Sequence, residues 1–427
     1  MIARREARGG TLVVGGGFAG AYVARLLGRA GATIVNLDNF MLFTPLLPEA
    51  ASATLEPRHV VVPLRQMCPH AELLLGRVVT RDPEARTVVA ETLGGTFEIG
   101  YERVVIALGA VPRTVAVPGL AEHGRGFKDV ADAIALRNRI LRSLESAAAR
   151  LDRGEAARDL GFVFVGAGYA GVEALAELHD LAHDAVRRSY PSLRDVRQRW
   201  VLVEAAPTIL SEIPRKLGVY THRELEGRGI EIRVSTTLES FDGAEALLSD
   251  GSRIPARTLV WSAGVRPSPD LARLGLPLDE RGRVVVDAHL RVAGQTDAWS
   301  LGDCAAVPNA ATPGRFDPPT CQHALRQARR LARNLKGPEE PYAYRMLGQV
   351  ATLGRYKGIA ELPGFRLRGF LGWFVARTYH LYALPMFRRK VRVVADWTVS
   401  LGFRRDIVEL SALGHPHALD GDERPPG

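Results

Sequence analysis

The sequence predicts an α/β fold with two parallel-sheet domains and a smaller basic domain after them, and three observations support this. A short apolar strand, a Gly-x-Gly-x-x-Gly turn and a helical pattern follow one another near the N-terminus. The same order returns about 150 residues later in the chain. Beyond residue 337 the composition becomes basic and aromatic. A strand, a glycine turn and a helix in this order are typical of a doubly wound, Rossmann-like sheet.

The first glycine turn lies between an apolar strand and a helix expected over 19–29. Gly15 makes the tight turn, Gly17 lets the backbone approach a pyrophosphate, and Gly20 lets the helix pack closely on the sheet. The helix N-terminus then directs free N–H groups at the phosphates. A second apolar strand ends at Asp38, which we expect to accept hydrogen bonds from ribose hydroxyls. These features predict a dinucleotide site.

The second glycine turn contains Gly166, Gly168 and Gly171 and opens another helical pattern. A later apolar strand ends at Glu204, after a basic polar insertion over 187–199. A carboxylate at a strand end pairs with a ribose 2′-hydroxyl and repels a 2′-phosphate, which favours NADH over NADPH. Two such turns in one chain predict two bound dinucleotides.

Three further apolar runs extend these two units. Residues 103–109 and 258–264 are strand patterns that end in glycine, and each is followed shortly by proline. A third strand pattern, over 298–303, closes on Gly302 and Asp303. The Asp303 carboxylate can bind a cofactor hydroxyl, or the pair can form a plain turn.

Charge and cysteine content narrow the possible classes of protein. The 427 residues carry a net charge of +9, which favours an anionic cofactor, a membrane surface or nucleic acid as partner. Cys68, Cys304 and Cys321 show no CxxC spacing, so the sequence predicts neither a disulfide scaffold, nor a Cys-based zinc site, nor a redox disulfide. The closest candidate for a membrane span, 370–387, is interrupted by Arg377 and His380 and falls short of the roughly 20 apolar residues required.

Three local segments point to one family. Residues 38–47 (DNFMLFTPLL), 171–178 (GVEALAEL) and 319–327 (PTCQHALRQ) resemble segments of the type II NADH dehydrogenases, which are single-subunit, non-pumping NADH:quinone oxidoreductases. In that family these segments are the loop beside the flavin, the helix after the second glycine turn, and the quinone-site motif Ala-Gln-x-Ala-x-Gln. The resemblance extends from about residue 11 to residue 406.

The third segment departs from the family motif at two positions. Gln322 and Ala324 match it, whereas Cys321 and Arg326 stand where the family has Ala and the second Gln. Because this motif belongs to the quinone site, the two differences affect the identity of the electron acceptor more than the flavin chemistry. His323 can hydrogen-bond an acceptor or serve as a satisfied histidine between domains.

The resemblance implies that the first glycine turn holds FAD and the second holds NADH, and that hydride passes from NADH to flavin N5. Two electrons then pass on to a membrane quinone. The implied FAD-binding residues are Gly15, Gly17, Phe18, Ala19, Gly20, Asp38, Pro45, Ala107, Gly109, Gly302 and Asp303. The implied NAD-binding residues are Gly166, Gly168, Tyr169, Ala170, Gly171, Glu204, Ala263 and Gly264.

Two residues are candidates for a direct part in the reaction, and no metal site is expected. Gln322 is expected to contact the acceptor. Glu173 can relay protons to a quinone, because a carboxyl group beside an apolar cofactor can have a pKa near neutrality. Alternatively, Glu173 caps its helix and favours the positive end of the helix dipole.

The expected domains are an FAD-binding domain over 1–118 and 282–336, an NAD(H)-binding domain over 119–281 and a C-terminal domain over 337–427 with a disordered tail from Asp420. Residues 366–405 interleave aromatic and aliphatic residues with nine Arg and Lys residues, and Asp396 is their only acid. This pattern is typical of basic amphipathic helices on an anionic bilayer. The alternative is a dimer or interdomain face; nucleic-acid binding is disfavoured because no recognition fold accompanies the charge.

The sequence and the family resemblance therefore favour an NADH:quinone oxidoreductase bound peripherally to the cytoplasmic face of the cell membrane. Two alternatives remain open at this point: a soluble FAD-dependent NAD(P)H reductase with a protein or small-molecule acceptor, and a non-catalytic NADH sensor. The expected partners are a quinone or another acceptor, a membrane surface and, on the alternative reading of the C-terminal face, a second copy of the chain.

Overall fold

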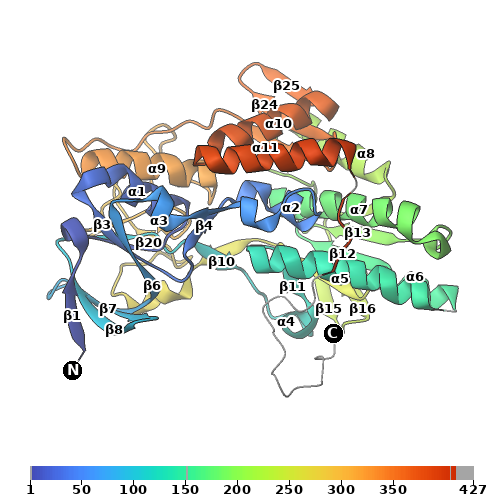
Figure 1. Cartoon of the computed structure of the whole chain (residues 1–427), viewed down its shortest axis with the longest axis horizontal. Coiled ribbons are helices and arrows are strands. Elements are labelled where there is room, and N and C mark those ends of the chain that lie inside the picture. Colours follow the sequence, from blue (N-terminus) through green and yellow to red (C-terminus); the bar gives the residue numbers. More distant parts are fainter. Residues whose placement is uncertain (1, 151, 404, 410–427) are drawn as a thin grey trace.

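A computed structural model describes residues 2–150, 152–403 and 405–409. The predicted disordered tail from Asp420 lies outside these ranges. The structure confirms an α/β fold with two mainly parallel sheets, which lie side by side in Figure 1. Elements from the C-terminal part run along one side of both sheets.

The first sheet contains eight strands in the order β1-β8-β7-β6-β3-β2-β9-β21. Its bounds are β1 Ala3–Glu6, β2 Thr11–Val14, β3 Ala32–Asn36, β6 Ala71–Asp82, β7 Thr87–Thr92, β8 Gly95–Gly100, β9 Arg103–Ile106 and β21 Ala298–Ser300. Strands β6, β3, β2, β9 and β21 pair in parallel, so their carboxyl ends meet at one edge. Helices α1 (Phe18–Leu27) and α9 (Cys321–Asn334) pack against each other beside this sheet.

Helix α1 is shorter than the predicted span 19–29. It ends at Leu27 because Gly28 adopts a φ of +61°, a left-handed conformation that an α-helix does not accommodate.

The second sheet contains five parallel strands in the order β11-β18-β12-β13-β14. Its bounds are β11 Arg125–Gly126, β12 Gly161–Val165, β13 Arg199–Val203, β14 Ile230–Arg233 and β18 Thr258–Trp261, with helices α5 Val130–Ala149, α7 Tyr169–Ser189 and α8 Arg215–Glu226. Helix α7 takes in the first three residues of the predicted insertion 187–199. The helix extends this far because Ala185 and Val186 continue its buried apolar face. The two arginines that follow them are exposed.

A short antiparallel pair links the two sheets. Strand β10 (Ala110–Pro112) follows β9, and β19 (Val265–Pro267) follows β18. The carboxyl ends of the central strands of both sheets therefore lie near each other, and so do the turns that leave them.

The C-terminal part forms a three-stranded antiparallel sheet and two helices (Figure 1). Its bounds are β23 Gln349–Thr352, β24 Gly358–Leu362, β25 Phe365–Arg368, α10 Gly369–Ala383 and α11 Phe387–Gly402. The shorter elements of the chain are β4 Phe40–Leu42, α2 Leu47–Ala51, β5 Val61–Pro63, α3 Leu64–Met67, α4 Leu120–His123, α6 Arg153–Asp159, β15 Leu238–Phe241, β16 Glu245–Leu248, β17 Arg253–Pro255, β20 Val284–Val285 and β22 Ala305–Ala306. Among the described residues, none of the helices is both long and apolar enough to cross a bilayer.

Buried ion pairs tie the C-terminal helices to the rest of the fold. Arg377 of α10 donates to Glu49 of α2 at 2.8 Å, and the Trp397 indole of α11 donates to the same carboxylate at 2.7 Å. Arg405 donates to Glu177 of α7 at 3.0 Å. Trp373 and Arg377 belong to the segment 366–405 that was predicted to face a membrane. In the structure both side chains are instead buried.

Candidate functional site

The first glycine turn forms an open cradle at the N-terminus of α1. Gly15 has a φ of +104°, and a Cβ there would overlap the carbonyl oxygen of Ala107. A Cβ on Gly17, in contrast, would have no atom within 4 Å, so the space beside this backbone is free. Gly20 lets α1 lie directly against the turn, because its own Cβ would overlap the carbonyl oxygen of Gly15. The tight turn at Gly15 and the close helix packing at Gly20 therefore both require glycine.

A cavity of about 640 Å³, the dinucleotide cavity, extends from this turn along the carboxyl edge of the first sheet. Its lining includes eight of the predicted FAD residues: Gly15, Gly17, Phe18, Ala19, Ala107, Gly109, Gly302 and Asp303. The volume of this cavity, together with the helix N-terminus and the free glycine backbone that line it, fits FAD. Gly20, Asp38 and Pro45 do not line it.

The residue at the end of β3 differs from the one predicted. The strand ends at Asn36 instead of continuing to Asp38, and Asn36 lines the dinucleotide cavity. The Gly16 N–H donates to Asn36 Oδ1 at 2.7 Å, while Asn36 Nδ2 donates to the carbonyl oxygen of Asp38 at 2.8 Å. The Asn36 amide therefore lies beside the glycine turn, where the Asp38 carboxylate was expected.

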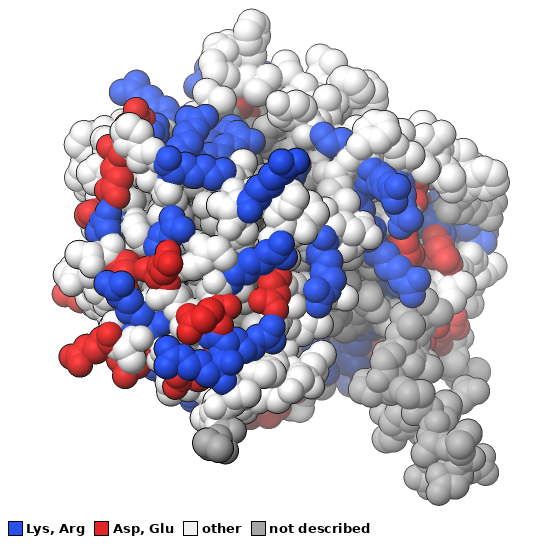
Figure 2. Space-filling model, turned by 60° about the vertical axis from the view of Figure 1, so that its left-hand side comes forward, with Lys and Arg blue, Asp and Glu red and all other residues white. Residues whose placement is uncertain are grey.

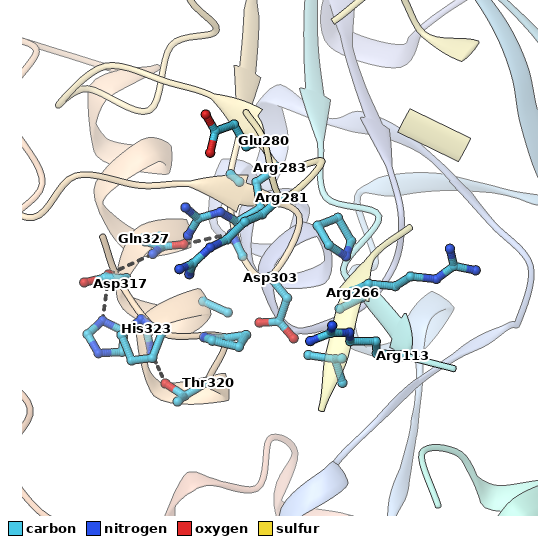
Figure 3. A pocket seen from close by; sticks show the side chains of 18 residues that line it. Arg113, Arg266, Glu280, Arg281, Arg283, Asp303, Asp317, Thr320, His323 and Gln327 are labelled. Carbon is cyan, nitrogen blue, oxygen red and sulfur yellow. Dashed lines mark hydrogen bonds and ion pairs between the residues drawn. The ribbon is translucent and has the colours of Figure 1, made fainter. Parts of the chain in front are cut away.

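A second, basic cavity of about 540 Å³ adjoins the dinucleotide cavity at Gly302 and Asp303. Figure 3 shows arginines on two sides of Asp303: Arg113 and Arg266 on one, Arg281 and Arg283 on the other. Arg283 is held by Asp279 at 2.8 Å. Within the described residues, the other three arginines form no ion pair, which leaves their charge free for an anionic ligand.

The second glycine turn repeats the geometry of the first. Gly166 also has a φ of +104°, and a Cβ there would lie 2.7 Å from the backbone nitrogen of Ala263, whereas a Cβ on Gly168 would meet nothing within 4 Å. Glu204, at the end of β13, accepts hydrogen bonds from Ala167 N–H at 2.6 Å and Ala206 N–H at 2.8 Å. Its contact with Ala167 is the counterpart of the Asn36 contact with Gly16. The second unit therefore presents a charged carboxylate where the first presents a neutral amide.

A third cavity, of about 300 Å³, lies where the two units and the C-terminal part meet, and we name it the interdomain cavity. It adjoins the dinucleotide cavity, since Thr44, Lys128, Pro319 and Cys321 line both. Its other lining residues are Pro45, Leu47, Pro48, Phe127, Tyr169, Ala170, Glu173, Glu212, Thr320, Gln322, Met346, Gln349, Val350, Tyr379 and His380. Both residues with a predicted direct part in the reaction, Glu173 and Gln322, thus border one cavity.

Glu173 is buried on this cavity with one carboxylate oxygen engaged. Its Oε1 accepts hydrogen bonds from the Thr352 N–H at 2.8 Å and the Thr352 hydroxyl at 3.2 Å. Burial raises the pKa of Glu173 to about 8, an effect that outweighs the two hydrogen bonds from Thr352. The group is therefore mostly protonated at pH 7 and can release or take up a proton near neutral pH.

Gln322 and His323 are both held by protein groups. The Gln322 amide donates to the carbonyl oxygen of Gly348 at 3.3 Å and accepts from the Tyr344 hydroxyl at 3.1 Å. His323 lines the basic cavity instead of the interdomain cavity and pairs with Asp317 at 2.7 Å (Figure 3). Two residues of the C-terminal part that were not predicted as site residues also line the interdomain cavity, namely Gln349 and His380.

Comparison with known proteins agrees with this architecture. The family model for pyridine nucleotide-disulphide oxidoreductases matches residues 10–328. The chain is 31% identical to the "Type II NADH:quinone oxidoreductase Ndh" of Mycobacterium tuberculosis over 91% of this chain and 87% of that protein. It is also 31% identical to a "Probable NADH dehydrogenase" of Dictyostelium discoideum over 88% of this chain and 85% of that protein.

Solved structures share the fold. NDH2 from Plasmodium falciparum in complex with NADH superposes with a TM-score of 0.87 at 17% identity, covering 93% of this chain and 99% of that one. A ferredoxin reductase from Rhodopseudomonas palustris superposes with a TM-score of 0.66 at 23% identity, covering 82% and 81%. The paired glycine turns, the cavity between them and the match to full-length relatives agree: the chain belongs to the pyridine nucleotide-disulphide oxidoreductase family and, within it, to the type II NADH:quinone oxidoreductases.

Proposed function

We propose that this chain is an FAD-dependent NADH dehydrogenase that passes two electrons to a quinone at the cytoplasmic face of a membrane. The observation that carries the proposal is the interdomain cavity, which joins the dinucleotide cavity, the second glycine turn and the C-terminal helices. Two relatives that match most of the chain are named as an NADH dehydrogenase and a type II NADH:quinone oxidoreductase, which supports the proposal.

The residues of the first unit would hold FAD. The N–H groups at the start of α1 would bind its pyrophosphate, and Asn36 and Asp303, which line the same cavity, would hydrogen-bond its hydroxyl groups. Arg113 and Arg281 of the adjoining basic cavity would add positive charge at the Asp303 end of this site. When bound, FAD supplies an isoalloxazine ring that accepts two electrons as a hydride and releases them to a second acceptor.

The second unit would hold NADH. Gly166, Gly168 and the N-terminus of α7 form its phosphate cradle, and the Glu204 carboxylate favours a ribose with a free 2′-hydroxyl. Tyr169 and Ala170, the first residues of α7, line the interdomain cavity and would bind the nicotinamide end there.

Glu173 would supply protons to the reduced acceptor. Its carboxyl group borders the cavity, and its raised pKa keeps a proton available at pH 7. An acid with a pKa close to the working pH serves well in both directions of a proton transfer. Reduction of a quinone to a quinol consumes two protons with the two electrons. Glu173 would donate protons in this step.

The exposed face of α10 and α11 would contact the membrane. Apolar side chains at least 40% exposed occur along both helices: Phe370, Leu371, Phe374, Tyr382, Phe387, Val391, Val394, Val399 and Leu401. Figure 2 shows basic and uncharged side chains with few acids along the upper edge of the molecule, where Figure 1 places these helices. An apolar face with surrounding basic residues binds anionic lipid surfaces.

A spectroscopic titration tests the redox proposal. The purified yellow protein is mixed anaerobically with NADH and then with a short-chain ubiquinone. We expect NADH to bleach the flavin band and the quinone to restore it over many turnovers. Bleaching that only a protein acceptor reverses would favour the soluble reductase, and no bleaching by NADH would overturn the dehydrogenase proposal.

Vesicle sedimentation tests the membrane proposal separately. The parent protein is expected to sediment with anionic vesicles, and a variant with Phe370→Ser, Phe374→Ser and Phe387→Ser is expected to stay in solution with its flavin. Leu93→Ser is the matched control, because Leu93 is 87% exposed at the β7–β8 turn, away from these helices. Equal sedimentation of all three proteins would contradict the assignment of this face.

A further inference from the structure

A lysine lies where the dinucleotide cavity and the interdomain cavity meet. Four residues line both cavities, and Lys128 is the charged residue among them. It belongs to the turn between β11 and α5 (Figure 1) and is partly exposed. The junction of the two cavities therefore carries a positive charge.

The start of α5 fixes the backbone of this turn. The Lys128 N–H donates to Asp132 Oδ2 at 2.7 Å, and the Asp132 N–H donates to Asp129 Oδ1 at 2.8 Å. Asp129 and Asp132 form a capping box at the N-terminus of the helix. Phe127, the residue before the lysine, is buried and lines the interdomain cavity. The turn therefore holds Lys128 against both cavities.

The ammonium group of Lys128 has no partner of its own. Within residues 2–150, 152–403 and 405–409 it forms neither a hydrogen bond nor an ion pair. Its charge acts on Asp303 in the wall of the dinucleotide cavity: burial raises the pKa of this carboxyl group, and the charge of Lys128 opposes the rise. Arg77, which also lines this cavity, is instead paired with Asp270. Lys128 thus gives the cavity a cation that no acid neutralises.

The position of a bound flavin ring follows from the two glycine turns. With FAD in the first unit and NADH in the second, hydride can pass only where the two sites meet. The residues at this point are those that line both cavities, because the interdomain cavity extends to Tyr169 and Ala170 at the second glycine turn. The isoalloxazine ring would therefore lie beside Lys128.

Hydride uptake changes the charge of this ring. A hydride carries one proton and two electrons, so the ring gains one negative charge when NADH is oxidised to NAD⁺. Opposite charges attract more strongly in a cavity shielded from water than in bulk solvent. A cation beside the ring therefore stabilises reduced FAD more than oxidised FAD, and this difference raises the reduction potential of the cofactor.

We propose that the Lys128 ammonium group sets the reduction potential of bound FAD by pairing with the negative charge that the ring gains with the hydride. In this role Lys128 contacts the cofactor, and it neither donates a proton nor binds the electron acceptor. This inference rests on the proposed function, because it requires FAD in the first unit with its ring at the junction of the two cavities.

The test is Lys128→Met in the FAD-loaded full chain, because methionine keeps an unbranched apolar side chain and removes the charge. The midpoint potential is measured by dithionite titration against a reference dye, which requires neither NADH nor a quinone. We expect the preference of the site for reduced over oxidised FAD to fall about tenfold, which lowers the potential by about 30 mV for a two-electron couple. The content of oxidised FAD and the melting temperature are expected to stay level.

Two further variants serve as controls. Lys128→Arg keeps the positive charge and should recover most of the parent potential. Lys216→Met removes a lysine at an exposed position near the start of α8, outside both cavities, and should change none of these quantities.

The possible results separate this inference from the proposed function. An unchanged midpoint potential in Lys128→Met would overturn the inference. Loss of oxidised FAD from Lys128→Met would also overturn it, since the lysine would then hold the cofactor without regard to its redox state. If Lys128→Met does not fold, Lys128→Gln gives the same measurement. A parent protein that binds no flavin, or whose flavin NADH does not bleach, would instead overturn the proposed function.

Discussion

Replacing Glu173 by Gln removes a titratable group that lines the interdomain cavity with a pKa near neutrality. In the fold its pKa is about 8, against 4.5 for an ordinary glutamate. A difference of this size corresponds to about 5 kcal/mol of preference for the neutral carboxyl. Between pH 4.5 and 8 the folded protein keeps a proton that the unfolded chain releases. This contribution to stability is therefore fully present below pH 4.5, declines through the window, and is lost above pH 8.

The variant Glu173→Gln isolates the charge of this group, because glutamine is neutral at every pH and keeps the oxygen that accepts from Thr352. The assay is urea unfolding of the variant and the parent, both loaded with FAD, at pH 6 and at pH 9. We expect the free energy of unfolding of the variant to exceed that of the parent by about 3 kcal/mol more at pH 9 than at pH 6.

The rate of flavin reoxidation provides a second test of Glu173→Gln. We expect reoxidation of the flavin by a quinone at pH 7 to slow about 100-fold, as for the loss of a general acid, while its reduction by NADH is retained. Glu212→Gln is the control, since Glu212 borders the same cavity but is exposed. A stability difference that does not change with pH, together with normal reoxidation, would refute the reasoning.

Three further substitutions test other parts of the site. Gly15→Ala places a Cβ against a backbone carbonyl, so we expect purified protein without flavin absorbance, whereas Gly95→Ala, also at positive φ but with open space around its Cβ, should retain flavin. Glu204→Gln removes the charge that opposes a 2′-phosphate, and the ratio of kcat/KM for NADPH to that for NADH should rise about tenfold; an unchanged ratio would contradict the placement of the ribose there. Arg377→Met leaves the Glu49 carboxylate buried without its cation and should cost about 3–5 kcal/mol in urea unfolding, most of which Glu49→Gln in the same chain should restore.

The two-unit α/β framework and its glycine turns could be predicted from the amino-acid sequence. Apolar strand patterns, glycines and the helices after them are local features, and the tight turns at Gly15 and Gly166 require glycine whatever surrounds them. The strand end at Glu204 could likewise be predicted, because the apolar run stops there.

Which polar groups face which cavity, in contrast, depends on how distant segments pack. The end of β3 at Asn36 depends on its pairing with neighbouring strands, and the sequence beyond it still looks like a strand as far as Leu37. Burial of Glu173 and the pairing of Glu49 with Arg377 depend on contacts between segments far apart in the chain. The position of His380 on the wall of the interdomain cavity likewise depends on how α10 packs, because a helical pattern by itself does not reveal which of its residues border a cavity.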